Sequence, residues 1–278
     1  MARPLRILLP GGLYHLIARG NAREPCFRAE DDRRAFLATL EHVLERFGWL
    51  IYAYCLMENH YHLVAETPLP NLPAGMRQLN GLYARRFNIR HGRCGHVFQA
   101  RYRSILVDGD AYLLEVCRYV VLNPIRAGIC AEPGAYRWSS YRATNGEAKA
   151  ELPLALQSLL ALFAPRPALA RARYREFVRA GIVEALEQRV RGERLGGEAF
   201  LRERFGYEPP LPEIPRRQVE PLPPSLAEIF AAGDPVPVAT AYRRHGYTIG
   251  QIAAHLGCHH STVSRRLRRE ERVAKCKT

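Results

Sequence analysis

The sequence lacks the paired cysteine motifs of disulfide-rich and zinc-binding proteins. Its seven cysteines show neither C-x-x-C spacing nor a regular repeat. This pattern indicates neither a disulfide framework nor a zinc knuckle, and it predicts free thiols in a reducing compartment. No apolar stretch approaches the roughly 20 residues of a membrane span, and the first apolar run is too short for a signal peptide. We therefore expect a cytoplasmic protein without a membrane partner.

Acidic residues are scarce relative to basic ones. The 278 residues include 41 Lys and Arg against 27 Asp and Glu, which gives a net charge of +14 and an isoelectric point near 9.8. The excess lies at both ends of the chain, whereas the middle is nearly neutral. A charge of this size predicts a partner rich in phosphate. A solvated basic surface without a partner is the plainer alternative.

Apolar periodicity over the first half of the chain alternates between two and about 3.6 residues. It predicts strands at 11–20, 50–57, 61–67 and 104–108, helices at 30–49 and 71–92, and a last helix from Asp110 to the residue before Pro124. This order indicates an α+β sandwich, with a mainly antiparallel sheet and helices on one or both faces.

The composition and apolar periodicity of the sequence change after residue 145, and we place the end of the first domain there (1–145). Residues 146–205 are rich in Ala, Leu, Arg and Glu, and this composition predicts a helical extension. Residues 206–224 contain seven prolines and little periodicity, as is typical of an extended linker. A second, small all-α domain is expected over 225–278.

The stretch "MENHYHLVAE" (57–66) places two histidines in a predicted strand. Residues two apart in a strand share a face, so His60 and His62 project together and could hold one ion. Polar residues on a half-buried strand are the plainer interpretation of such a pair. The pair therefore needs support from elsewhere in the chain.

That support comes from "CRYVVLNPIRAGI", in which Tyr119 and Asn123 lie four apart at the end of the last helix and share one face. If this helix packs beside the histidines, two imidazoles and an amide oxygen form a partial shell suited to Mg²⁺ or Mn²⁺. The metal would polarise a phosphodiester, and Tyr119 would attack it to form a covalent phosphotyrosine. A core aromatic residue is the alternative interpretation of Tyr119.

These motifs carry a family resemblance. "CLMENHYHLVAETP", followed about sixty residues later by "RYVVLNPIRAGI", resembles the single-tyrosine HUH transposases, most closely the REP-associated tyrosine transposases of bacteria. The opening "MARPLRILLPGGLYHLIARGNAREPCF", with "GHVFQARYRSILVD" and "YRWSSYRA", extends the resemblance over nearly all of residues 1–145. The family usually has an aliphatic residue between the histidines where this chain has Tyr61, and many relatives have Gln where it has Asn123.

The resemblance implies a ferredoxin-like or RRM-like sandwich. It implies that His60 and His62 are the metal-binding pair, that Asn123 is the third ligand and that Tyr119 is the nucleophile. It further implies that the protein nicks single-stranded DNA hairpins of REP-like repeats, and that Tyr119 becomes linked to a 5′ phosphate while a 3′ hydroxyl is freed.

Two segments are predicted to bind DNA. Residues 83–104 interleave aromatic rings with cations, which suits a single strand whose bases can stack on the rings. The C-terminal "YTIGQIAAHLGCHHSTVSRRLRREE" resembles resolvase-type and regulator helix-turn-helix units, with Gly257 at the turn and a second helix for a major groove of duplex DNA. The predicted contacts are Arg85, Arg86, Arg90, Arg93, Arg101 and Arg103 in the first segment, and His259, His260, Ser261, Thr262, Ser264, Arg265 and Arg266 in the second.

Three functions remain open on the sequence alone. The first is a metal-dependent endonuclease and strand transferase with a duplex-binding module. The second is a non-cleaving DNA-binding regulator that keeps the same architecture. The third is a hydrolase of small substrates, which would need more metal ligands at the ends of later strands than the sequence offers. Both a monomer and a homodimer are compatible with the sequence.

Overall fold

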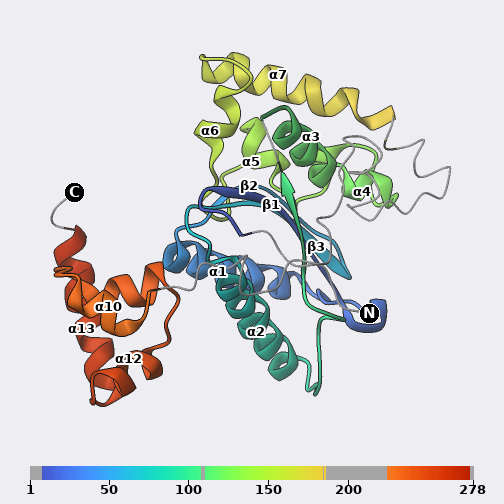
Figure 1. Ribbon diagram of the computed structural model, residues 1–278. Helices are drawn as coiled ribbons and strands as arrows, with labels where there is room; N and C mark the ends of the chain where they lie inside the picture. Colours follow the sequence, from blue (N-terminus) through green and yellow to red (C-terminus); the bar gives the residue numbers. More distant parts are fainter. Residues whose placement is uncertain (1–7, 108–109, 184, 186–223, 276–278) are drawn as a thin grey trace, which may run out of the picture.

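Strands and helices alternate over the first half of the chain, and the rest is helical (Figure 1). The computed structural model describes residues 8–107, 110–183, 185 and 224–275. The order is β1 (Gly12–Arg19), η1 (Asn21–Arg23), α1 (Glu30–Phe47), β2 (Leu50–Leu56), β3 (His60–Thr67), α2 (Leu72–Arg90), β4 (Arg103–Val107), α3 (Asp110–Val121), α4 (Asn123–Arg126), η2 (Pro133–Ala135), α5 (Tyr141–Asn145), α6 (Leu156–Ala161), α7 (Pro167–Ala180), α10 (Leu226–Ala231), α11 (Pro237–Ala239), η4 (Thr240–Arg244), α12 (Ile249–His255) and α13 (His260–Lys275).

The four strands form one antiparallel sheet in the order β2-β3-β1-β4. The predicted α+β class is confirmed, and the βαββαβ order is that of a ferredoxin-like sandwich. In the pairing of the two central strands, His15 of β1 lies opposite Val64 of β3, and Ile17 lies opposite His62. This register brings polar residues of both strands to one face.

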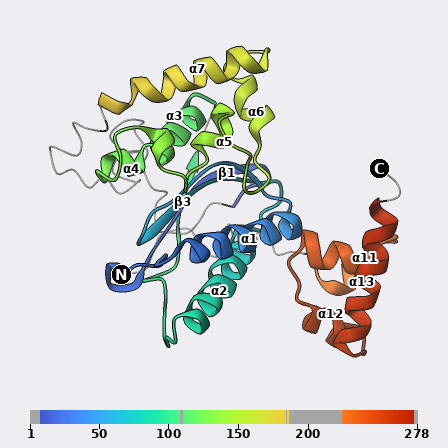
Figure 2. The same ribbon diagram turned by 180° about the vertical axis from the view of Figure 1, so that it is seen from behind.

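Helices cover both faces of the sheet (Figures 1 and 2). Leu16 and Leu63 belong to the core beneath α1 and α2, whereas Ile17 and Val64 belong to the core beneath α3. The alternation follows from the two-residue period of a strand, because both faces are buried. The sheet therefore has a face under α3 that can hold a site.

Helix α1 shows why the predicted boundaries hold. The carboxylate of Asp32 accepts hydrogen bonds from the backbone of Arg28 and Ala29, and this satisfies donors at the start of the helix. Gly48 ends it in the left-handed region at φ +70°, which glycine adopts without steric cost.

The helices after β4 form two further groups. Tyr141 of α5, with Tyr174 and Val178 of α7, packs against Leu122 and Ile125, so these helices lie over the α3 side of the sheet. Helices α6 and α7 fall in the predicted helical extension, whereas residues 186–205 and nearly all of the predicted linker 206–224 lie outside the described residues.

The C-terminal helices enclose a core of their own, with Ile229, Val238, Ile252, Val263 and Leu267 buried together. Within the described ranges, no helix combines the length and the apolar character that crossing a membrane requires. The cysteines of these ranges are all free thiols, as predicted.

Candidate functional site

Strand β3 carries the two predicted histidines on the face that α3 covers. Tyr61 between them points to the opposite face, where it is fully buried and its hydroxyl donates to Asn80 Oδ1 at 2.6 Å. The ring centroids of His60 and His62 lie 5.0 Å apart. The structure therefore brings the pair together on one face, as strand alternation requires.

Each of the two rings has its Nδ1 atom engaged. His60 Nδ1 lies 2.7 Å from Asn59 Oδ1, and His62 Nδ1 lies 2.9 Å from His15 Nε2. The Nε2 atom of each ring is thus the one left to coordinate a ligand. A histidine ligand is commonly held in this way, through a hydrogen bond from its second ring nitrogen.

His15 is a site residue that sequence analysis did not single out. It is fully buried on β1, diagonal to His62, and the two rings stack with centroids 5.1 Å apart and an interplanar angle of 23°. The sequence signal was a polar residue inside the apolar ladder "GLYHLIAR". Its partner becomes visible only when β1 is paired with β3.

Helix α3 places the ring of Tyr119 against these histidines. The ring centroid lies 5.8 Å from that of His15 and 5.9 Å from that of His62, and Tyr119 is only 3% exposed. The apolar residues of α3, including Val116 and Val120, pack on the same sheet face and hold the ring there. Two predicted site residues, His62 and Tyr119, therefore lie in contact distance although they are distant in sequence.

Arg126 covers Tyr119 from α4. Its guanidinium carbon lies 4.2 Å from the ring centroid, and its Nη1 donates to the backbone carbonyl of Tyr119 at 2.6 Å. Burial raises the pKa of the Tyr119 phenol, while the charges of Arg126, Arg19 and Arg103 act to lower it. Three cations thus act on the Tyr119 phenol and favour its anionic form.

Asn123 differs from the expected continuation of one helix. Helix α3 ends at Val121, and Asn123 begins the short helix α4. Its amide nitrogen donates to the carbonyls of Tyr119 at 3.0 Å and Val120 at 3.2 Å, so the side chain caps the end of α3. This contact keeps Asn123 close to the backbone of Tyr119, as the spacing of four residues predicted. Coordination of a metal through Asn123 Oδ1 stays a prediction.

Burial keeps the histidines of the site neutral. It lowers the pKa of His15 to about 3 and that of His60 to about 4, with Arg103 and Arg19 adding to the effect respectively. The pKa of His62 is also lowered, chiefly by burial and then by its neighbours His60 and His15. Neutral imidazole is the form that binds metal ions. Among the described residues, no group of three or more His, Cys, Asp and Glu side chains could hold a metal, so the candidate set is two imidazoles and an amide.

The arginines predicted to follow a single strand serve different purposes. Arg86 donates to Thr39 Oγ1 at 2.9 Å, and Arg90 forms an ion pair with Asp31 at 3.3 Å, so both stabilise the contact between α1 and α2. The guanidinium carbon of Arg93 lies 5.9 Å from the ring centroid of Phe87. Arg85 and Arg101 are exposed. Arg103 lies on β4 opposite Ile17, beside the histidine face.

Helices α12 and α13 form the predicted helix-turn-helix unit. Gly257 turns the chain at φ +61°, and Val263 and Leu267 bury one face of α13. The opposite face is exposed and basic. The exposed residues of α13 include His260, Ser261, Thr262, Arg265, Arg268 and Arg269.

Four residues of the predicted duplex-reading set, His259, Ser261, Ser264 and Arg266, also have side-chain contacts within the unit. His259 Nδ1 lies 3.0 Å from Ser261 Oγ at the start of α13. Arg266 Nε donates at 2.9 Å to Glu270, whose other carboxylate oxygen accepts from the backbone of Ala239. Ser264, which is half-buried, donates to the carbonyl of His260. The outward residues of α13 are thus better placed for DNA than Arg266.

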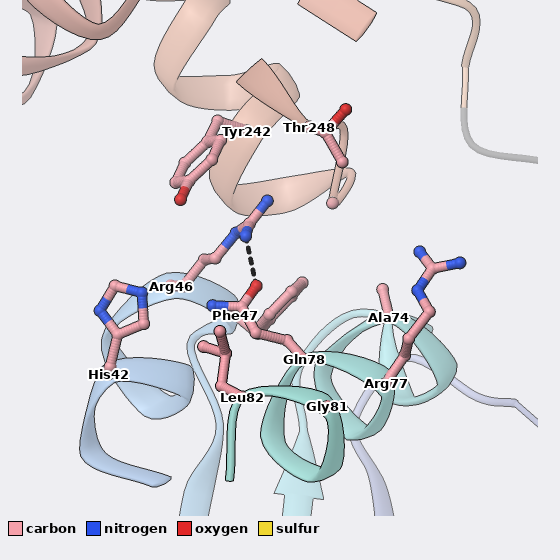
Figure 3. A pocket seen from close by; sticks show the side chains of 11 residues that line it. His42, Arg46, Phe47, Ala74, Arg77, Gln78, Gly81, Leu82, Tyr242 and Thr248 are labelled. Carbon is pink, nitrogen blue, oxygen red and sulfur yellow. Dashed lines mark hydrogen bonds between the residues drawn. The ribbon is translucent and has the colours of Figure 1, made fainter. Parts of the chain in front are cut away.

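A separate cavity of about 460 Å³ lies where the C-terminal helices meet α1 and α2 (Figure 3). In Figure 3, Arg46 points from α1 toward Tyr242, and its guanidinium is hydrogen-bonded to Gln78. His42 and Arg77 line the same cavity. It lies on the α1–α2 side of the sheet, away from the histidines, so we do not assign the chemistry to it.

Comparisons with known proteins agree with these two units. Residues 11–123 match the family model described as "Transposase IS200 like", and residues 239–270 match that described as "Helix-turn-helix domain". Among solved structures, the chain is similar to a REP-associated tyrosine transposase bound to a REP hairpin, with 14% identity over 56% of this chain and 96% of that chain and a TM-score of 0.47. It is also similar to a putative transposase from Deinococcus radiodurans R1, with 20% identity over 43% of this chain and 94% of that chain and a TM-score of 0.31. No curated protein matches the chain.

Proposed function

We propose that the protein is a metal-dependent endonuclease and strand transferase of the tyrosine HUH class. The chain matches an IS200-like transposase domain and a C-terminal helix-turn-helix domain. The proposed enzyme nicks single-stranded, hairpin-forming DNA repeats through a 5′-phosphotyrosine. The observation that carries the proposal is the meeting of Tyr119 with the histidine face, where its ring lies 5.9 Å from that of His62. The resemblance seen in the sequence is confirmed for the two domains, and the reaction is the inference drawn from them.

The residues present fit a divalent cation. His60 and His62 are neutral, share a face and have their Nδ1 atoms engaged, so Nε2 is the atom of each ring left for a ligand. With Asn123 Oδ1 they form a donor set of intermediate hardness with positions left for phosphate oxygens, which suits Mg²⁺ or Mn²⁺. When bound, the ion supplies Lewis-acid polarisation of the scissile phosphate.

The chain's own residues supply the nucleophile and its setting. The phenol oxygen of Tyr119 forms a bond to phosphorus while the bond from phosphorus to the 3′ oxygen breaks. The phenol proton passes to solvent and the 3′ oxygen takes up a proton, so no water molecule is consumed. Rejoining reverses it, because the phosphotyrosine conserves the energy of the phosphodiester. Arg126, Arg19 and Arg103 offset the negative charge that gathers at phosphorus.

The substrate proposal is a REP-like hairpin with a duplex part and an unpaired flank. The sequence resemblance to REP-associated tyrosine transposases supports it, and so does the division of basic surface between two units. The outward face of α13 presents Thr262, Arg265 and Arg269 to a major groove. Arg85 and Arg101 are exposed on the first domain, where an unpaired strand can reach them.

The first test is covalent adduct formation. End-labelled single strands that carry hairpins from the flanks of the protein's own gene are incubated with the protein and Mg²⁺ or Mn²⁺, then separated under denaturing conditions. We expect an adduct that requires the metal, is lost in Tyr119→Phe and is lost in His60→Ala/His62→Ala. Tyr61→Phe is the matched control: its hydroxyl lies on the other sheet face, so its adduct should persist.

A non-cleaving DNA-binding regulator is the second candidate. The observation that favours it is the burial of Tyr119, which at 3% exposure must become accessible before it can meet a phosphate. The regulator predicts tight hairpin and duplex binding with no adduct in wild type, across several flanking hairpins. That result would displace the endonuclease proposal.

A further inference from the structure

His15 is a fully buried polar residue to which the proposed reaction gives no task. It stands on β1 beneath α3, and its Nε2 lies 2.9 Å from His62 Nδ1. Its other nitrogen, Nδ1, is buried and has no hydrogen-bond partner among the described residues. Buried polar atoms are normally paired, so an unpaired atom beside a candidate metal ligand calls for an explanation.

One proton is shared in the hydrogen bond between His15 Nε2 and His62 Nδ1, and either ring can donate it. In one arrangement His62 Nδ1–H donates to His15 Nε2, so His62 Nε2 keeps its lone pair and His15 carries its own proton on Nδ1. In the other arrangement His15 Nε2–H donates to His62 Nδ1, and the proton of neutral His62 must then sit on Nε2. The two arrangements are exclusive, because each neutral imidazole has one N–H.

Only the first arrangement leaves His62 able to coordinate through Nε2. We infer that His15 is a positioning residue that fixes the tautomer and the ring orientation of His62 for metal binding. The inference rests on the proposed function, since it assigns His15 a task at the same site. His15 accepts the Nδ1–H of His62 and is itself no ligand.

The rest of the geometry agrees with this task. Asn59 Oδ1 meets the Nδ1 atom of His60 just as His15 meets that of His62, so both ligand rings are held through the same atom. The stacked ring of His15 and the edge contact with Tyr119 also restrict rotation of His62. An acceptor beyond the ligand commonly contributes about 10- to 100-fold to metal affinity.

The first experiment reads the tautomer directly in wild type. Long-range ¹H–¹⁵N spectra of the full chain, recorded without metal and with saturating Mg²⁺, distinguish protonated from unprotonated ring nitrogens. With Mg²⁺ bound, we expect the proton of His62 on Nδ1 and that of His15 on Nδ1. A His62 proton on Nε2 in the metal-bound protein would overturn the inference without any variant.

The second experiment measures Mn²⁺ affinity without DNA, by electron paramagnetic resonance of the free ion. His15→Leu removes the acceptor and should weaken Mn²⁺ binding about 10- to 100-fold. His15→Gln, whose amide oxygen can accept the same proton, should recover much of the loss. His42→Leu makes the same replacement at an exposed histidine of α1, on the other side of the sheet, and should bind as wild type does.

The two proposals fail in different ways. If wild type binds no Mn²⁺, or binds it no better than His60→Ala/His62→Ala does, the metal-dependent function is wrong and so is this inference. If wild type binds and His15→Leu binds equally well, only the role of His15 is wrong. Circular dichroism identifies a His15→Leu protein that is merely unfolded, and a folded His15→Gln protein with no recovery of affinity would contradict the acceptor role.

Discussion

The electrostatic setting of Tyr119 depends on one residue seven positions further along the chain. Arg126 lies over the phenol ring and also holds the backbone carbonyl of Tyr119, so it fixes the ring and favours its anionic form. A regular helix would not allow both contacts, because residues seven apart are two turns away from each other. Helix α3 ends at Val121 and α4 begins at Asn123, so the chain between Tyr119 and Arg126 is not one regular helix.

Removing this charge should slow the chemistry more than binding. In Arg126→Leu we expect the single-turnover rate of adduct formation to fall about tenfold, as loss of a partly buried cation–ring contact implies. Arg118→Leu is the control, because Arg118 stacks instead on Phe177, 4.4 Å from its ring centroid. Equal losses in both variants, or a loss confined to hairpin affinity, would contradict the assigned role of Arg126.

At the scale of elements, periodicity predicted the strands and helices of the first domain well. Each predicted segment has its counterpart in β1–β4 and α1–α3, because both sheet faces are covered and the apolar patterns are strong. The expected single helix through Asn123 was wrong in detail. Pro124 has no backbone N–H to continue α3, and it is instead accommodated in the first turn of α4.

The pairing of β1 with β3 was the part of the candidate site that the sequence could not reveal. His60 and His62 are recognisable because they are two apart in one strand, and Tyr119 and Asn123 because they are four apart. His15 meets His62 only through the register that sets Ile17 opposite His62. Such a neighbour depends on strand pairing, which a local pattern does not contain.

Helix α2 offers a test of how closely the elements opposite the site are packed. Gly75 is buried, and a Cβ added there would collide with the indole ring of Trp49. Trp49 cannot yield easily, because its Nε1 donates to Asn71 Oδ1 at 2.7 Å. We therefore expect Gly75→Ala to lower the free energy of unfolding by about 1–3 kcal/mol, as overpacked cores do.

Gly81 is the matched control within the same helix. A Cβ at Gly81 meets nothing within 4 Å, so Gly81→Ala should raise the free energy of unfolding by about 0.5–1 kcal/mol through helix propensity alone. Urea unfolding followed by circular dichroism measures both variants. A Gly75→Ala protein as stable as wild type would show that α2 can move away from Trp49 at little cost.

At the scale of the whole molecule, Arg46 joins the two DNA-binding units. Its guanidinium carbon lies 3.7 Å from the ring centroid of Tyr242, and its Nη2 donates to the carbonyl of Tyr247 at 3.2 Å. Arg243 adds a contact from the C-terminal unit to the carbonyl of Glu45. These contacts join the proposed duplex-reading helix α13 and its unit to the α1–α2 side of the sheet, away from the candidate site (Figures 1 and 2).

This junction should matter for substrates that engage both units at once. In Arg46→Ala we expect the affinity for a hairpin with a flanking duplex to fall about tenfold. Once one unit has bound its part of the DNA, the loosened junction lowers the effective concentration of the other unit at its own part. The affinities for an isolated hairpin and for an isolated duplex should stay near those of wild type. Arg77→Ala removes one charge from the same cavity without a contact to Tyr242, so it controls for charge. Fluorescence anisotropy with the three DNAs measures these affinities. An equal fall in Arg77→Ala would show that the loss of positive charge explains the effect, and it would contradict the coupling role of Arg46.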